Sequence, residues 1–222
     1  MLDNLARKRL ISIKDAAEAI VRQRTIIPDH QALLVAISGI DGSGKGYLTD
    51  KIATLLLKRG LNIANINLDG WLNLPEKRFS KINPPEQFYR HAIRFEELFG
   101  QLVFPLRNRR SIYLEADFTE ETATEYRKHI YSFEEVDVIL LEGIYLLKHQ
   151  FQSYYDLSFW IDCSFETALE RAIARSQEGL SPEETIQAYQ TIYFPAQKIH
   201  FELDQPQRSA IARINNDPRL GG

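Results

Sequence analysis

The chain has 222 residues, of which 44% are hydrophobic, and a formal net charge of −3. This length and apolar content predict one large α/β domain with its own core. The acidic balance argues against bulk nucleic-acid binding, which needs a basic face, so a small molecule is the expected partner. The single cysteine, Cys163, excludes an intramolecular disulfide and the usual zinc-ligand clusters, and it suits a reducing compartment.

The first 30 residues are expected to form a helical extension that packs on the rest of the chain, 31–222. Ser12 and Asp15 have the spacing of a capping box, and apolar residues recur at helical spacing after them, which predicts a helix over 13–24. The apolar stretch at 10–13 is too short for a signal peptide, and no later segment approaches a membrane span. We therefore expect a cytoplasmic protein with no membrane partner.

A glycine-rich loop between a predicted strand and a predicted helix is the most informative motif. Residues 32–37 form a continuous apolar run, as in a buried parallel strand, and apolar residues after the loop recur at helical spacing until Gly60. The loop nearly completes the Walker A pattern G-x-x-x-x-G-K-[ST], but Gly46 stands at its last position. Such a loop encloses phosphate oxygens with backbone N–H groups, while the helix N-terminus and the lysine add positive charge. The expected nucleotide-binding residues are Gly39, Asp41, Gly42, Ser43, Gly44, Lys45, Gly46 and Tyr47.

The rest of the chain alternates predicted strands with predicted helices. The expected strands are 62–68, 137–143, 157–162 and 210–214, with a hairpin of 111–118 and 122–129; the expected helices begin at Asn83, Ser164, Ser181 and Pro195, and a buried helical stripe runs through 88–102. This alternation predicts an α/β fold of three layers, in which a mostly parallel sheet has helices on both faces and ligands gather at the carboxyl ends of the strands.

Two acidic residues follow predicted strands at that edge. Phosphoryl transfer needs a phosphate cradle, a magnesium site, a base for the acceptor hydroxyl and cations over the transferring group. Asp69 is placed to accept a proton from an alcohol, or else to cap the next turn. Glu142 ends the most hydrophobic strand, where its ionised form needs a partner such as magnesium or Lys45, unless the side chain is simply exposed.

Two arginines supply candidate cations. Arg171 and Arg175 are four residues apart in a predicted helix and therefore share one face, from which they could close on phosphates or form surface ion pairs. A second basic cluster, at 107–110, could bind an acceptor that already carries a phosphate, or form a solvated turn.

These motifs, in this order, resemble the P-loop kinases of the uridine kinase and phosphoribulokinase family, and most of all its bacterial uridine kinase-like members. The matching segments between 32 and 220 are the glycine loop, 68–71, 83–89, 139–144, 161–162 with Arg171 and Arg175, 193–197 and 214–218. The resemblance implies a P-loop NTPase fold, ATP as phosphoryl donor and Mg²⁺ as cofactor. It also implies Asp69 as base, Glu142 and Asp69 at the metal, Lys45, Arg171 and Arg175 as catalytic cations, and a short helical lid at about 171–192.

The chain departs from this family at two places. The family usually has Ser or Thr after the loop lysine, whose hydroxyl binds magnesium, whereas this chain has Gly46 and only Thr49 nearly a turn away. Family lids are rich in arginine, whereas residues 176–197 contain no Lys or Arg. The sequence therefore leaves two functions open: an active kinase, or a nucleotide-binding sensor that has lost efficient transfer.

The acceptor site is the part that the sequence determines least. Trp71, Tyr89 and Tyr113 could stack on a base or sugar and Asp117 could bind a hydroxyl, although aromatic residues at such spacing also fit a core. A nucleoside such as uridine is the first expectation for the acceptor. Pantothenate, a sugar phosphate or a glycerate-like alcohol are the alternatives, and a homo-oligomer stays open.

Overall fold

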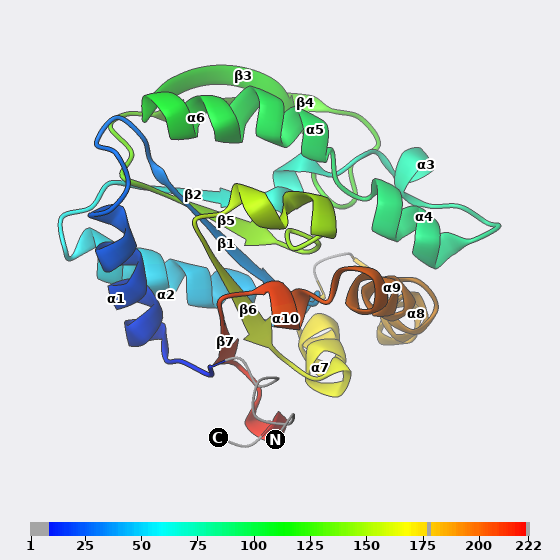
Figure 1. Ribbon diagram of the computed structural model, residues 1–222. Helices are drawn as coiled ribbons and strands as arrows, with labels where there is room; N and C mark the ends of the chain where they lie inside the picture. Colours follow the sequence, from blue (N-terminus) through cyan, green and yellow to red (C-terminus); the bar gives the residue numbers. More distant parts are fainter. Residues whose placement is uncertain (1–8, 177–178, 221–222) are drawn as a thin grey trace.

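The computed structural model describes residues 9–176 and 179–220 (Figure 1). Residues 1–8 of the predicted extension, 177–178 of the predicted lid and 221–222 at the end of the chain lie outside the described residues. In the part of the chain that is described, no helix combines the length and apolar character needed to cross a membrane.

A five-stranded parallel sheet forms the centre of the fold (Figure 1). The strands, in spatial order, are β2 (Ile63–Asn67), β5 (Val138–Gly143), β1 (Leu33–Gly39), β6 (Leu157–Asp162) and β7 (Ala212–Asn215). The three inner strands β5, β1 and β6 are buried along their whole length, as strands covered on both faces must be. This arrangement confirms the predicted α/β fold with a parallel sheet.

Alternate residues of β1 enter two separate cores, because successive side chains of a strand point to opposite faces. Leu33, Val35 and Ile37 pack with α1 (Ile13–Arg24) and α2 (Lys45–Leu57), which cover one face of the sheet. The predicted helix over 13–24 is confirmed, and its capping box between Ser12 and Asp15 is present. Leu34 and Ala36 pack on the opposite side, so helices cover both faces.

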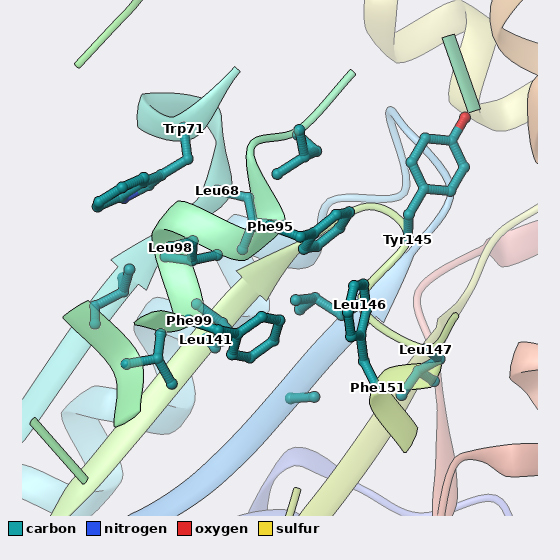
Figure 2. Close-up of a cluster of buried hydrophobic side chains, with 14 of the residues drawn as sticks. Leu68, Trp71, Phe95, Leu98, Phe99, Leu141, Tyr145, Leu146, Leu147 and Phe151 are labelled. Atoms are coloured by element: carbon teal, nitrogen blue, oxygen red, sulfur yellow. The ribbon is translucent and has the colours of Figure 1, made fainter. Parts of the chain in front are cut away.

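The opposite face carries the larger core. Figure 2 shows side chains of η1, α5, η2 and β5 meeting there, with Trp71 at one end of the cluster and Tyr145 and Phe151 at the other. The remaining helical segments, in chain order, are η1 (Leu68–Trp71), α3 (Pro75–Arg78), α4 (Pro84–His91), α5 (Phe95–Glu97), η2 (Leu98–Val103), α6 (Phe104–Arg109), η3 (His149–Tyr154), α7 (Phe165–Arg175), α8 (Pro182–Ala188), η4 (Tyr189–Tyr193), α9 (Phe194–Asp204), α10 (Pro206–Ser209) and η5 (Pro218–Leu220).

The helix expected to begin at Pro195 is present as α9, which starts at Phe194 with Pro195 in its first turn. It follows α8 and η4 without a break in the helical backbone. A proline inside a helix lacks an N–H group and its ring collides with the carbonyl four residues earlier. The segment η4 is a π-helical turn, whose wider backbone accommodates the proline that follows it, and η2 precedes Pro105 in the same way.

The predicted hairpin is present, with its second strand displaced along the chain. β3 (Ile112–Phe118) pairs antiparallel with β4 (Arg127–Phe133), so residues 122–126 belong to the connection and not to a strand. In the observed strand β4, Tyr131 stacks on Trp71, with ring centroids 5.7 Å apart. The hairpin therefore closes over the segment that follows β2.

Candidate functional site

A cavity of about 310 Å³ lies where the carboxyl ends of the parallel strands meet. The loop after β1, the segment η1 after β2, the end of β5 and the helix α7 contribute to its wall. Of the site residues expected from the sequence, it is lined by Asp41, Gly42, Gly44, Lys45, Gly46, Tyr47, Asp69, Glu142, Arg171 and Arg175. Gly39 and Ser43 lie behind this surface, since a Cβ atom on Gly39 would approach the buried Ser43 Oγ to 2.7 Å.

Two glycines give the loop its shape. Gly42 has a φ of +73° and Gly44 a φ of +78°, in the left-handed region that other residues rarely adopt. A Cβ atom would also collide with neighbours, at 2.5 Å from the Ala168 carbonyl oxygen for Gly42 and at 2.4 Å from Asn216 Nδ2 for Gly44. Both backbone conformation and close packing therefore require glycine at these positions.

The loop is held from outside by Arg171 and Asn216. The carbonyl of Ser43 accepts hydrogen bonds from Arg171 Nη1 at 3.0 Å and from Asn216 Nδ2 at 2.7 Å, and Arg171 Nη2 donates to the Asn216 carbonyl at 2.8 Å. The guanidinium of Arg171 thus supports the loop from the α7 side. The sequence identified Asn216 only within a matching segment, although its position directly after the last strand indicates this edge of the sheet.

The helical segments α7 and η4 also contact the loop through Asp41. Arg175 Nη2 lies 4.0 Å from Asp41 Oδ1, and its side chain is 44% exposed. Tyr189 of η4 donates a hydrogen bond to Asp41 Oδ2, and the Gly42 N–H donates to Asp41 Oδ1. Arg175 is therefore better placed than Arg171 to reach a phosphate in the cavity.

Lys45 and three carboxylates meet in the cavity. Lys45 Nζ lies 3.8 Å from Glu142 Oε1. Burial raises the pKa of Glu142 to about 7, Lys45 opposes this rise, and the carboxylates of Asp69 and Asp41 add to it. Burial also raises the pKa of Asp69, which lines the same cavity, while Lys45 opposes this rise too. Arg175, which lies near Asp41, also opposes the rise for Asp69, so cations and carboxylates share this cavity.

Glu142 predicts a pH-dependent stability. Because its pKa is raised from 4.5 to about 7, the folded chain keeps a proton between these pH values that the unfolded chain has released. The free energy of unfolding should therefore fall as the pH rises through this window, by up to about 3 kcal/mol, and level off above it. Urea unfolding at several pH values should show this loss in the natural chain and not in Glu142→Gln, with the exposed Glu86→Gln as control. Equal slopes in all three chains would contradict the assignment.

These donors fit a Mg²⁺ ion that protein and nucleotide hold together. Mg²⁺ typically takes one or two carboxylates, with substrate phosphates and waters as its other ligands, and Glu142 and Asp69 supply carboxylates. Thr49 Oγ1 donates to the Lys45 carbonyl at 2.9 Å, so it does not replace the hydroxyl that Gly46 lacks. Within residues 9–176 and 179–220, no group of three His, Cys, Asp or Glu side chains is arranged to hold a metal without a nucleotide.

A serine at position 46 is expected to make nucleotide binding more dependent on magnesium. A Cβ atom on Gly46 would lie 3.6 Å from Glu142 Oε2, an ordinary contact distance, so a hydroxyl fits beside that carboxylate. We expect Gly46→Ser to bind ATP several-fold more tightly with Mg²⁺ and little differently in EDTA, by isothermal titration calorimetry. Gly46→Ala is the control, because both changes remove a helical glycine and should stabilise α2 by up to about 1 kcal/mol. The same magnesium dependence in all three chains would show that water already replaces the hydroxyl.

None of the four residues expected to bind the acceptor lines this cavity. Trp71 is fully buried in the core (Figure 2), and Tyr89 is buried and donates its hydroxyl to Asp204 at 2.5 Å. Tyr113 is 74% exposed on β3, and Asp117 forms an ion pair with Lys128 at 2.8 Å. Asp69 and Trp71 are two residues apart in the tight 3₁₀ turn η1. Because of this turn, Asp69 lines the cavity while Trp71 packs into the core.

Other residues, which the sequence did not assign, line the wall of the cavity beyond the loop. They are Asn67, Leu72, Arg78, Phe88, Glu121, Ile144, Tyr193 and Gln197. Phe88, Tyr193 and Gln197 lie in segments that carry the family resemblance. The resemblance could therefore have identified these three residues as site candidates. Arg78 lies outside the matching segments, and it becomes a candidate only through its position in the structure.

Comparisons with known proteins agree with this architecture. No protein-family model matches the sequence. A structure titled a "Possible Uridine Kinase" from Bacillus stearothermophilus is similar, with a TM-score of 0.69 and 20% identity over 91% of this chain and 98% of that chain. D-glycerate 3-kinase from Cryptococcus neoformans var. grubii has a TM-score of 0.63 and 15% identity over 91% of this chain and 95% of that chain. The chain therefore shares the three-layer α/β fold of these two structures.

Proposed function

We propose that the protein is an ATP-dependent kinase that transfers the γ-phosphoryl group to a hydroxyl of a small molecule. The observation that carries the proposal is one cavity that joins the glycine loop, Lys45, Asp69 and Glu142. Phosphoryl transfer needs little covalent help from a protein beyond positioning, charge neutralisation and a proton acceptor. The glycine loop provides positioning, Lys45 provides charge neutralisation, and Asp69 provides the proton acceptor.

In the proposed reaction the loop and Lys45 hold the β- and γ-phosphates, and Arg175 covers the γ-phosphate from the α7 side. Asp69 takes the proton of the acceptor hydroxyl as its oxygen bonds to the γ-phosphorus. The bond from that phosphorus to the β–γ bridging oxygen breaks, and ADP leaves. Since burial raises the pKa of Asp69, its carboxylate is a stronger base than a solvated one. Magnesium, when bound with the nucleotide at Glu142, supplies charge neutralisation at the phosphate oxygens.

The acceptor is the finer part of the proposal. Resemblance to uridine kinase-like proteins favours a nucleoside such as uridine. One neighbour of the same fold is described as a possible uridine kinase and another as a D-glycerate 3-kinase, so the fold hosts different acceptors. Pantothenate, a sugar phosphate and a glycerate-like alcohol therefore remain candidates beside uridine.

The test is a phosphotransfer screen with ATP and Mg²⁺ across uridine, pantothenate, D-ribulose 5-phosphate and D-glycerate. ADP formation and direct detection of the phosphorylated product by mass spectrometry are both recorded. Product from one acceptor supports the kinase. Tight binding of magnesium and ATP with no acceptor turned over supports a sensor, for which the glycine at position 46 and the arginine-free stretch 176–197 are the motivation.

A further inference from the structure

We propose that Arg78 and Gln197 form the acceptor subsite, and that the acceptor is a small alcohol that carries an anionic group, either a carboxylate or a phosphate. This inference rests on the proposed kinase function and names the substrate class of the same cavity. It moves the expected acceptor away from uridine and toward the acidic alternatives.

Arg78 is a buried cation in the wall that also holds Asp69. It ends α3, is 2% exposed, and donates from Nη2 to the Glu121 carbonyl at 2.5 Å. Its Nε atom is buried and has no hydrogen-bond partner. No ion pair described for residues 9–176 and 179–220 includes Arg78. A buried guanidinium is costly without an anion, and burial lowers the pKa of Arg78, with Glu121 opposing the change. Glu121 and Asp69 act on this guanidinium without a described ion pair, so an anionic ligand would add the direct one.

Gln197 provides a complementary group in the same wall. It lies on α9, is 2% exposed, and its Oε1 atom is buried with no partner. A buried acceptor left without a hydrogen bond is destabilising. A hydroxyl of the ligand can donate to Oε1, while an anionic group accepts from Arg78. The wall thus matches a molecule that carries both a hydroxyl and an anionic group, such as a hydroxy acid or a sugar phosphate.

The rest of the wall favours a small acceptor. Phe88 and Tyr193 meet edge to face, with ring centroids 4.9 Å apart, and Leu72 adds apolar surface. At about 310 Å³ the cavity is near the lower end of ligand pockets, which span roughly 300–1,000 Å³, and it must also admit the transferring phosphate. The aromatic side chains expected to stack on a base, Trp71 among them, lie elsewhere.

The other basic cluster does not serve this purpose. Arg107 pairs with Asp156 at 2.7 Å, and Arg110 pairs with Asp137 at 2.7 Å. Neither arginine lines the cavity. Carboxylates pair with both of these arginines, whereas Arg78 lines the cavity and its Nε atom has no hydrogen-bond partner.

The experiment compares acidic acceptors with neutral partners of the same skeleton. D-glycerate is set against glycerol, D-ribulose 5-phosphate against D-ribulose, and uridine is included. A hydrogen-bonded charged contact is worth about 1.5–3 kcal/mol, so we expect kcat/KM for one acidic acceptor to exceed its neutral partner by about 10- to 100-fold. The glycerate and phosphate arms distinguish the two anionic groups.

Three variants test the residues. Arg78→Gln should raise KM for the acidic acceptor about 10- to 100-fold with a smaller change in kcat, and Arg78→Lys should recover part of the loss. Gln197→Glu, of nearly the same shape, should weaken the acidic acceptor more than the neutral one, because it adds a like charge. Arg90→Gln is the control, since Arg90 is exposed and pairs with Glu86 outside this cavity. A purely structural role for Arg78 would instead impair acidic and neutral acceptors equally.

Each outcome bears on one proposal. A neutral acceptor or uridine used as well as any acidic one overturns the inference and leaves the kinase intact. If no alcohol is phosphorylated although ATP binds, the kinase proposal fails, and thermal shift then judges the subsite alone. D-glycerate or D-ribulose 5-phosphate should raise the melting temperature of the natural chain in the presence of Mg²⁺ and ADP, but not that of Gln197→Glu or Arg78→Gln. No shift with either compound overturns the subsite.

Discussion

Asp69→Asn should lower the kcat of phosphotransfer by about 100- to 10,000-fold and leave the affinity for ATP in EDTA nearly unchanged. Asparagine keeps the size of the side chain, and the Asp69 N–H can still donate to Asn67 Oδ1, as it does at 2.7 Å. The amide cannot take the proton of the acceptor hydroxyl. The measurement is steady-state product formation with the acceptor found in the screen, together with calorimetric titration of ATP.

Asp117→Asn is the matched control for this change. Asp117 was expected from the sequence to contact the acceptor, but it pairs with Lys128 on the hairpin and does not line the cavity. Its replacement should leave both kcat and KM within about twofold, as is usual away from a site. If Asp69→Asn and Asp117→Asn behave alike, Asp69 is not the base.

The pH profile adds an independent check on Asp69. Burial raises the pKa of its carboxyl, and the base must be deprotonated to act. The kcat/KM of the natural chain should therefore fall as the pH is lowered through this raised pKa. The residual activity of Asp69→Asn should not show this fall.

The sequence predicts those parts of the fold and the site that depend on local patterns. The continuous apolar runs of β1, β5 and β6 reveal strands buried on both faces, and the spacing of Gly39, Gly44 and Lys45 reveals the loop between strand and helix. Parallel strands bring their carboxyl ends to one edge, so Asp69 and Glu142 could be expected near the loop without further information.

The remaining features depend on three-dimensional packing that no local pattern specifies. Asp69 and Trp71 are two residues apart, yet the turn η1 sends one to the cavity and the other to the core. Arg78 and Gln197 are far apart in sequence, and α3, which ends at Arg78, packs on α4, which in turn packs against η4 and α9, so that both residues line the same wall. The π turn η4 that joins α8 to α9 leaves no signature in the residue pattern, so the sequence predicts two separate helices where the structure has one continuous helical run.

Gly42→Ala should abolish most nucleotide binding and destabilise the fold. At a φ of +73° an alanine costs about 1–2 kcal/mol, and its Cβ atom would lie 2.5 Å from the carbonyl oxygen of Ala168 in α7. Because that oxygen belongs to backbone, the collision moves either the loop or α7, which adds about 1–3 kcal/mol. Such a movement also displaces Arg171, whose guanidinium holds the Ser43 carbonyl. We expect ATP affinity to fall by about 100-fold or more, since the loop amides must match the phosphates closely.

Gly60→Ala separates the two causes of this effect. Gly60 has a φ of +79°, and an added Cβ atom would have no neighbour within 4 Å. The change therefore carries the same backbone penalty without the collision, and it lies at the far end of α2 from the loop. Urea unfolding should show a loss of about 1–2 kcal/mol in Gly60→Ala and a larger loss in Gly42→Ala, while calorimetry should show normal ATP binding only in Gly60→Ala. If both variants bind ATP normally, the close approach of Gly42 to α7 is not needed for nucleotide binding, and the prediction is wrong.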